Sequence, residues 1–210
     1  MKKNEIIIII ILAILFGVAI VQHATNGQDD FLIKATPWFL LVVGIILILS
    51  LDLINKKVWF WLIGIYSITW GIEAVGTATG WPFGNYSYSN ILGFALANTP
   101  LIIGINWIIV SLGAYALAKF VGLKKIIPLI ITSAVLTLLL DIVMEPAAVK
   151  LDYWQWNTDS IPLQNYVSWF LIGLLIAYSL NKLKIKINKW VPGLIFIMLL
   201  IYFLSINIIY

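Results

Sequence analysis

The chain is 210 residues long, and 62% of its residues are hydrophobic while only 10% are charged. This composition excludes a soluble domain and is typical of a bundle of lipid-embedded helices. Cysteine is absent, which excludes disulfide bonds and thiolate metal sites. His23 is the one histidine, which excludes a multi-histidine di-iron site. The net charge of +4 comes from short lysine clusters between apolar runs, so we expect membrane lipid rather than nucleic acid as a partner.

Seven apolar runs follow one another along the chain, and about 20 apolar residues are needed to cross the bilayer core. The first run lacks a small-residue cleavage site after it, so we interpret it as a retained helix rather than a signal peptide. Pro37 and Pro100 are expected near helix starts, where a missing N–H does no harm. The sequence therefore predicts an all-α integral membrane helical bundle with about seven transmembrane helices, forming one polytopic domain over residues 1–210. The runs cover residues 5–21, 37–54, 58–78, 100–120, 126–144, 166–180 and 190–208.

The lysines are distributed unequally between the two sides of this bundle. Eleven of the 13 fall on alternate connections, and only Lys34 and Lys150 fall on the opposite side. Connections on the cytoplasmic side hold the excess of lysine in membrane proteins. The sequence therefore predicts an N-terminus inside and a C-terminus outside, in the cytoplasmic (inner) cell membrane. Seven crossings satisfy that parity.

The predicted outer connections carry the unusual sequence. Residues 22–36 form a modest polar loop, in which His23 is expected at the membrane interface. Residues 79–99 combine glycine, proline and aromatic residues, and we expect their apolar piece 91–97 to re-enter the membrane or to lie along it. Residues 145–165 include a Trp-Gln-Trp sequence. An interfacial aromatic belt would explain part of this pattern, but the acidic residues nearby favour a functional site on this side.

Three acidic residues lie within or at the end of apolar runs. A carboxylate at bilayer depth costs about 2.5–3.5 kcal/mol on insertion scales, so it marks a functional site by default. Asp141 and Glu145 are four residues apart and share one face of a helix. Glu73 shares a face with Trp70 and Thr77 by the same spacing. We expect the third and fifth runs to pack together, so that the three acids converge near the outer third of the bundle.

Convergence of three acids would favour acid catalysis. Like charges in a dry site cannot all ionise, so at least one carboxyl group should keep its proton at neutral pH. A carboxylic acid that is kept neutral can act as a general acid. The alternative is that these side chains only bind backbone groups or adjust helix packing.

The motifs between about residues 64 and 169 resemble those of the membrane carotenoid hydratases, which include the bisanhydrobacterioruberin hydratases and the γ-carotene hydratases. The residues 157–160 depart from the turn expected in that family before Ile161 and Pro162. The resemblance rests on Glu73, Gly76, Thr79-Gly80, Pro82-Phe83-Gly84, Tyr86, Tyr88, Leu92-Gly93, Asn98 to Leu101, Trp107, Asp141, Glu145-Pro146-Ala147, Trp154-Gln155-Trp156, Ile161-Pro162, Asn165-Tyr166 and Trp169.

This resemblance implies an enzyme that adds water across the terminal double bond of an acyclic carotenoid end and gives a tertiary alcohol. Asp141 or Glu145 would then donate the proton, and Glu73 would orient the water or the donor. The polyene would reach the site from the lipid, no metal or organic cofactor would be needed, and other carotenoid enzymes are conceivable partners. Aromatic faces would stabilise the carbocation. The residues expected to bind substrate are Trp70, Trp81, Phe83, Tyr86, Tyr88, Asn98, Trp154, Trp156, Asn165 and Trp169.

Two alternatives remain open at the level of sequence. A lycopene-type cyclase would use the same acid chemistry and differ only in what captures the cation. A small-molecule transporter or ion channel would use the acids to bind a proton or a cation. A retinal photoreceptor is excluded, because it needs a lysine within a span and every lysine here lies in a loop or at a span end. The sequence does not specify the carotenoid, the number of ends that react, the proton donor or the oligomeric state.

Overall fold

The computed structural model describes residues 3–26, 30–51, 55–123, 125–188 and 190–210. Seven α-helices account for most of these residues, which confirms the all-α class. Lys2, Lys124 and Lys189, which contribute to the predicted lysine asymmetry, lie outside the described residues. The helices are α1 (Lys3–Asn26), α2 (Asp30–Leu49), α3 (Lys56–Thr79), α4 (Ile102–Phe120), α5 (Ile126–Lys150), α6 (Leu163–Lys182) and α7 (Val191–Ile209).

Six of the seven helices are long and apolar enough to cross a membrane, as judged over the described residues. The exception is α2, whose apolar part Ile33–Leu49 is shorter, near the lower end of the length that a membrane span requires. The molecule is therefore a multi-pass membrane bundle. Aromatic side chains such as Trp38 (70% exposed) and Phe94 (76% exposed) face outward, as is usual for lipid-facing surfaces.

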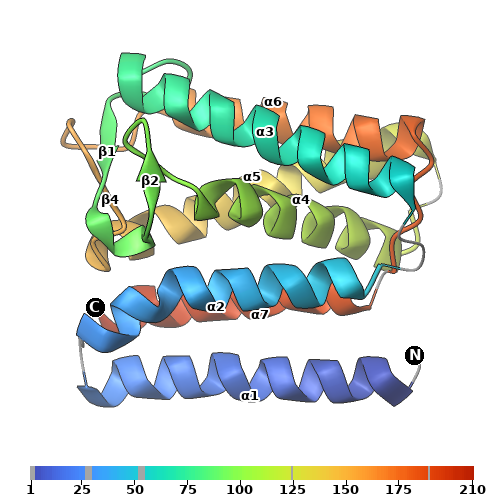
Figure 1. Ribbon diagram of the computed structural model, residues 1–210, viewed down its shortest axis with the longest axis horizontal. Helices are drawn as coiled ribbons and strands as arrows, with labels where there is room; N and C mark the ends of the chain where they lie inside the picture. The colour runs from blue at the N-terminus through green and yellow to red at the C-terminus, as the bar shows by residue number, and fades with distance from the viewer. Residues whose placement is uncertain (1–2, 27–29, 52–54, 124, 189) are drawn as a thin grey trace.

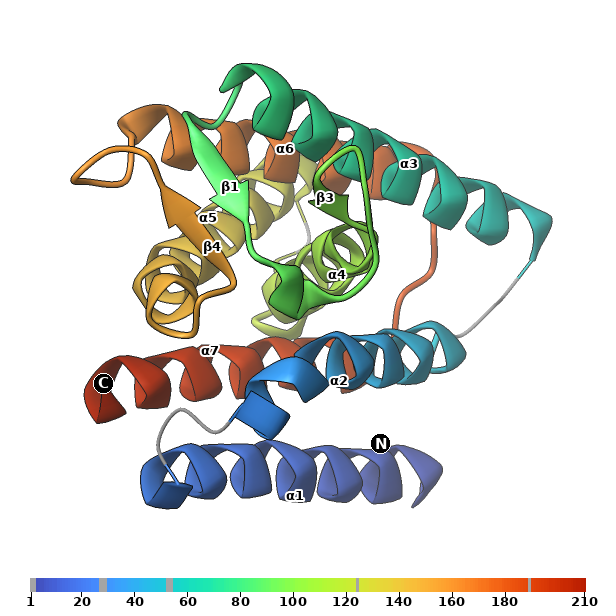
Figure 2. The same ribbon diagram turned by 60° about the vertical axis from the view of Figure 1, so that its left-hand side comes forward.

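The helices are stacked in layers, and α4 lies at the centre. Figures 1 and 2 show α3 and α6 on one side of α4 and α5, with α2 and α7 on the other side and α1 outermost. The main helix contacts are those of α5 with α6 and of α4 with α5 and α7. Most of α4 is buried, because neighbours surround it. Its apolar side chains therefore form the core of the bundle.

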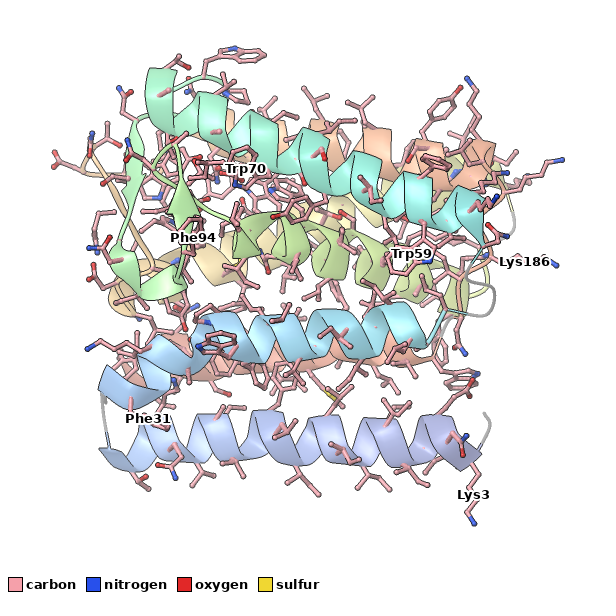
Figure 3. The ribbon with its side chains drawn as sticks, in the orientation of Figure 1. Lys3, Phe31, Trp59, Trp70, Phe94 and Lys186 are labelled. Carbon is pink, nitrogen blue, oxygen red and sulfur yellow. The ribbon has the colours of Figure 1, made fainter. Side chains whose placement is uncertain are left out.

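The two ends of the bundle differ in content. The termini lie at opposite ends, and the short strands gather at the end that holds the C-terminus (Figures 1 and 2). Lys3 and Lys186 project at the other end, while Phe31 and Phe94 lie toward the strand end (Figure 3). Opposite termini agree with an odd number of crossings. Which end faces the cytoplasm stays a prediction from the lysines.

Four short strands and one 3₁₀ turn make up the structure at this end. They are β1 (Tyr86–Tyr88), the 3₁₀ turn Asn90–Leu92, β2 (Ala95–Leu96), β3 (Thr99–Pro100) and β4 (Trp154–Trp156). Strand β2 pairs antiparallel with β3. The apolar piece 91–97 is therefore part of a turn and a small hairpin, and its place in or along the membrane stays a prediction. Glycine at 93 has a φ of +83°, a conformation that ends a helical run.

Two local predictions about the first half of the chain were wrong. Helix α1 continues to Asn26 and α2 begins at Asp30, so little remains of the predicted loop 22–36. Pro37 lies inside α2 rather than at its start. His23 is only 3% exposed, and its ring nitrogens lie 3.2 Å from the hydroxyls of Tyr202 and Tyr210. His23 is thus buried against α7 in the last turn of α1, and its place at the membrane interface stays a prediction.

Candidate functional site

The site is built around the pairing of β1 with β4, two strands that are far apart in the sequence. Tyr86 lies opposite Trp156, and Tyr88 lies opposite Trp154. Since alternate residues of a strand point to the same face, all four rings lie on one side of the pair. The ring centroids of Tyr86 and Trp156 are 5.3 Å apart, and those of Tyr88 and Trp154 are 6.0 Å apart. The pair therefore connects the segment after α3 to the segment after α5.

Glu73 of α3 accepts three hydrogen bonds and is 4% exposed. The hydroxyls of Tyr86 and Tyr88 donate to its Oε2 at 2.5 Å and 2.8 Å. The indole Nε1 of Trp107 donates to its Oε1 at 2.8 Å. Burial and the neighbouring charge of Glu73 raise the pKa of Tyr86 and of Tyr88, so both phenols keep their protons and remain donors.

Gly76 makes this arrangement possible. A Cβ atom there would lie 2.8 Å from the Tyr86 hydroxyl and 2.9 Å from Cδ2 of Phe83, which is closer than side chains pack. Gly80 then ends α3 in the left-handed conformation with a φ of 75°, and its N–H donates to the Gly76 carbonyl. The chain can therefore turn back sharply and bring Tyr86 beneath the helix that carries Glu73.

Glu145 of α5 also accepts three hydrogen bonds and is 2% exposed. The indole groups of Trp154 and Trp156 donate to its Oε2 at 3.0 Å and 2.8 Å. The amide of Asn165, on α6, donates to its Oε1 at 3.2 Å. The same amide nitrogen donates to Oδ2 of Asp141 at 3.0 Å. Asn165 thus joins two carboxyl groups that lie one helical turn apart.

Asp141 is the least supported of the three acids. It has no exposed surface, and its Oδ1 atom has no hydrogen-bond partner among the described residues. Hydrogen bonds donated to a carboxylate favour its charged form, and an unpaired buried oxygen is costly. The arrangement therefore supports charge on Glu73 and Glu145 better than on Asp141.

A small cavity separates Glu73 from Glu145. It has a volume of about 20 Å³, which is enough for a water molecule. The stacked rings of Trp107 and Trp169, with centroids 3.9 Å apart and planes at 21°, form part of its wall. Its lining contains no lysine or histidine among the described residues. The lining residues are Glu73, Phe83, Tyr86, Tyr88, Ile103, Asn106, Trp107, Met144, Glu145, Trp154, Trp156, Asn165 and Trp169.

Two further cavities adjoin this one. A polar hollow of about 330 Å³ lies at the strand end of the bundle and shares Tyr86 and Tyr88 with the small cavity. An apolar cavity of about 200 Å³ lies on the other side. The residues that line both it and the small cavity are Ile103, Asn106, Met144 and Trp154. The carboxylates therefore lie between a polar hollow and an apolar one.

Asn106 stands where the small and the apolar cavities meet. It is 8% exposed and lines both cavities. Its side chain makes no hydrogen bond to any described residue. A buried amide without partners has strong unused hydrogen-bonding capacity. Asn106 can therefore bind a water molecule or a polar group that enters either cavity.

The structure gathers most of the residues predicted to form the site. Glu73 and Glu145 line the small cavity, and Asp141 lies behind Asn165 without lining it. The prediction that the third and fifth helices pack together was wrong, because α3 packs mainly on α4. Glu73 and Glu145 therefore do not meet through direct packing of their helices. The β1–β4 pair and Trp107 bring them together instead. Of the predicted substrate-binding residues, those that line the small cavity are Phe83, Tyr86, Tyr88, Trp154, Trp156, Asn165 and Trp169.

Three predicted residues lie elsewhere. The indole of Trp70 donates to the Thr99 carbonyl at 3.4 Å, Trp81 is 70% exposed, and Asn98 lines the polar hollow. Sequence reasoning assigned no role to Trp107 or Asn106. A signal for Asn106 was present, because a polar residue inside an apolar run is the same signal that identified Glu73. The described residues contain no group of three or more His, Asp or Glu placed to hold a metal ion.

Comparisons with known proteins bear on this site. A family model described as "Carotenoid biosynthesis protein" matches residues 35–209. The bisanhydrobacterioruberin hydratase of Haloarcula japonica is 27% identical over 201 residues, which cover 88% of this chain and 68% of that protein. No solved structure matches the chain. The matched region includes both carboxylates and both strands that hold them.

Proposed function

The chain belongs to the carotenoid biosynthesis protein family, and on that premise we propose that it is a hydratase that adds water across the terminal double bond of an acyclic carotenoid end. The product is a tertiary alcohol. The observation that carries this proposal is the water-sized cavity between two buried carboxylates, each held by three hydrogen-bond donors. The name of the relative from Haloarcula japonica supports the same chemistry.

The first step is protonation of the alkene. Glu145 gives its proton to the less substituted carbon of the double bond, whose π electrons form the new C–H bond. The neighbouring carbon becomes a tertiary carbocation. The three donors of Glu145 favour its charged form, but burial and the like charge of Glu73 across the small cavity oppose that charge and keep the proton on Glu145. Glu145 is better placed for this role than Asp141, because Glu145 lines the cavity and Asp141 does not. Asp141 fixes the amide of Asn165, which also holds Glu145, so we assign Asp141 a positioning role.

The aromatic walls stabilise the cation. The faces of Trp154, Trp156 and Trp169 line the cavity, and an aromatic face attracts a nearby cation by about 0.5–2 kcal/mol. The carboxylate of Glu73 adds a negative charge on the opposite side. Both effects are stronger in a site from which bulk water is excluded.

The second step is capture of the cation by water. A water molecule in the cavity attacks the tertiary carbon, and Glu73 accepts the proton that this oxygen loses. The Tyr86 hydroxyl oxygen lies 2.5 Å from Oε2 of Glu73, a distance typical of a hydrogen bond from a hydroxyl group to a negatively charged oxygen. This supports a charged Glu73, which can act as the base. Further water passes the proton back to Glu145. In total, one C–H bond and one C–O bond form, and the π bond of the alkene and one O–H bond of water are lost.

Separate supplies of water and polyene fit this scheme. Water reaches the cavity from the polar hollow past Tyr86 and Tyr88. The polyene approaches from the apolar side, where the bundle meets lipid. Asn106, at the boundary between the two, holds the attacking water by its unpaired amide. No sequence of steps here requires a metal or an organic cofactor.

Isotope labelling of the product tests the proposal. Membranes that contain the protein are incubated with lycopene in H₂¹⁸O and, separately, in D₂O. A hydratase gives a product with ¹⁸O in a new hydroxyl group and one carbon-bound deuterium next to the carbinol carbon. A product of altered retention that gains one carbon-bound deuterium per closed ring in D₂O but no ¹⁸O in H₂¹⁸O would instead identify a cyclase. Recovery of unlabelled lycopene alone would refute both reactions and favour transport.

A further inference from the structure

The apolar cavity beside the carboxylates is the largest feature that the proposed mechanism leaves unused. It has a volume of about 200 Å³ and lies between α1, α2, α4 and α7. Most of its lining is aliphatic or aromatic, and none of it belongs to the residues expected from sequence to bind substrate except Trp154. The apolar residues that form its walls include Leu15, Phe16, Phe39, Leu40, Leu199 and Phe203.

The size of the cavity limits what it can hold. A dry cavity of about 150 Å³ lined by Leu, Ile and Phe takes up a benzene molecule, which has six carbon atoms. A volume of about 200 Å³ therefore fits a five-carbon isoprene unit with its methyl groups and little more. A complete polyene is far too long, so most of such a ligand must lie outside the cavity.

The cavity is open on the side where lipid lies. Leu15 and Val18 of α1 line it, yet they are 38% and 53% exposed. Helix α1 is the outermost helix in Figures 1 and 2 and packs mainly on α7. A chain that leaves the cavity between these side chains passes directly into the hydrocarbon layer without crossing water.

The opposite wall of the cavity is shared with the catalytic side. Ile103 and Asn106 of α4, Met144 of α5 and Trp154 of β4 line both this cavity and the small one. Trp154 also donates to Glu145 at 3.0 Å. The inner end of a ligand in the apolar cavity therefore lies next to the groups that hold the proposed acid.

We propose that this cavity binds the terminal isoprene unit of the carotenoid and presents its double bond at the Asn106–Trp154 wall, while the rest of the polyene extends past α1 into lipid. This inference rests on the proposed hydratase function. It assigns substrate binding to α1, α2 and α7, which carry none of the motifs of the site. The small cavity then holds water, and the reaction occurs where the two cavities meet.

A cavity-filling substitution with a matched control tests this binding site. Ala19 of α1 lines the cavity, whereas Ala13 of the same helix is exposed and does not line it. Ala19→Phe fills the cavity, and Ala13→Phe makes the same chemical change on the lipid side. We expect Ala19→Phe to lower the rate at low lycopene about tenfold or more, through a higher KM, and Ala13→Phe to match the wild type. Equal rates for the two variants would overturn the inference.

Two additions separate binding from folding and from chemistry. Leu40→Trp fills the cavity from α2 and should reproduce the loss, while membrane accumulation of each variant checks folding. Co-purification of lycopene with Glu145→Gln, alone or with Ala19→Phe, reports binding without turnover. If the wild type hydrates lycopene but Ala19→Phe and Leu40→Trp do so equally well, the cavity assignment fails and the function stands. If Ala19→Phe abolishes the co-purification of lycopene with Glu145→Gln, but the wild type hydrates no lycopene, the hydratase function fails and the cavity assignment stands.

Discussion

The two carboxylates on either side of the small cavity are held in similar ways by different chemistry. Each carboxylate lies on an apolar helix that is followed by a short strand with aromatic residues at alternate positions: α3 and β1 for Glu73, α5 and β4 for Glu145. Each receives two bonds from its own strand and one from a neighbouring helix. The strand donors of Glu73 are phenol O–H groups, whereas those of Glu145 are indole N–H groups.

This difference separates proton exchange from proton storage. Phenol oxygens donate and accept hydrogen bonds, and Tyr86 and Tyr88 also line the polar hollow, so Glu73 lies beside a route for water. Indole and amide N–H groups only donate at neutral pH, so they cannot relay a proton. Of the small, polar and apolar cavities among the described residues, Glu145 lines only the small one. The same framework therefore leaves Glu73 beside a route for water, where it can act as a base, and leaves Glu145 away from that route, where a proton is exchanged only through the small cavity.

The largest expected effect comes from removing the acid. Glu145→Gln keeps the shape of the side chain and most of its hydrogen bonds but has no proton to give. General acid–base assistance is worth about 10²–10⁴-fold, and we expect a loss at the upper end because the carbocation cannot form without a donor. Initial rates on lycopene in membranes measure it. A rate within tenfold of the wild type would refute acid catalysis by Glu145.

Removing the base should cost less and leave a different trace. In Glu73→Gln the alkene is still protonated, but water is not deprotonated as it attacks, so we expect a loss of about 10²-fold. The cation then re-forms the alkene by losing an original hydrogen from the protonated carbon or from an adjacent methyl group. In D₂O the recovered lycopene should therefore gain carbon-bound deuterium without hydration, and with Glu145→Gln it should gain none. Deuterium in both variants, or in neither, would contradict the separate roles.

Single strand donors sharpen the comparison further. Tyr86→Phe removes a short bond to a charged oxygen, and bonds to charged groups contribute about 1.5–3 kcal/mol, so we expect a loss of about tenfold to 10²-fold. Trp156→Phe should cost less than tenfold, because Trp154 still donates to the same oxygen of Glu145 and phenylalanine keeps a π face. Trp154→Phe serves as the reciprocal control. A larger loss of rate from either tryptophan variant than from Tyr86→Phe would contradict the expectation that the single donor Tyr86 matters more than either indole donor of Glu145.

Asp141→Asn separates a positioning residue from a proton donor. The variant replaces one acceptor of the Asn165 amide, so we expect about a tenfold loss in rate with both isotopes still incorporated from H₂¹⁸O and D₂O. A loss as large as that of Glu145→Gln would show instead that Asp141 supplies the proton.

The smallest effect on activity is expected from labels that test the orientation of the bundle. Lys186→Cys lies at the lysine-rich end and Asp159→Cys in the connection after β4, and both positions are exposed. In a cysteine-free chain, we expect an impermeant thiol reagent added outside intact cells to label Asp159→Cys alone. Labelling of Lys186→Cys alone would place the carboxylate end of the bundle in the cytoplasm.

The helices and the acids were predictable because both follow local rules. An apolar run must be long enough to cross the bilayer core, and α3 to α7 lie close to their predicted ranges. Exposing a carboxylate to lipid costs free energy, so Glu73 and Glu145 face the interior of the bundle. The identification of Phe83 and the two aromatic strand pairs as neighbours of the acids likewise followed from their motifs. Helix α5 continues past its predicted end at Met144 to Lys150, with Pro146 inside it.

The pairing of β1 with β4 was not predictable from either segment. Each strand has three residues, too few for a pattern of alternation, and the partners lie far apart in the sequence. Trp81 was assigned to the site as one of the aromatic residues of its loop, yet the turn at Gly80 directs it outward. Trp70 was assigned by its helical spacing from Glu73, but its indole donates to the Thr99 carbonyl instead. The apolar cavity could not be predicted for the same reason, because its walls come from five helices and from two connections, and no local pattern records how these pack.

The spacing between each acid and its strand has a consequence for how the protein is made. The tyrosines of β1 follow Glu73 by 13 and 15 residues, and the tryptophans of β4 follow Glu145 by 9 and 11 residues. During synthesis each acidic helix therefore enters the membrane almost together with its own donors, which offset part of the roughly 2.5–3.5 kcal/mol that a buried carboxylate costs. Two half-sites are inserted one after the other, and the second completes the first when β4 emerges and closes on β1.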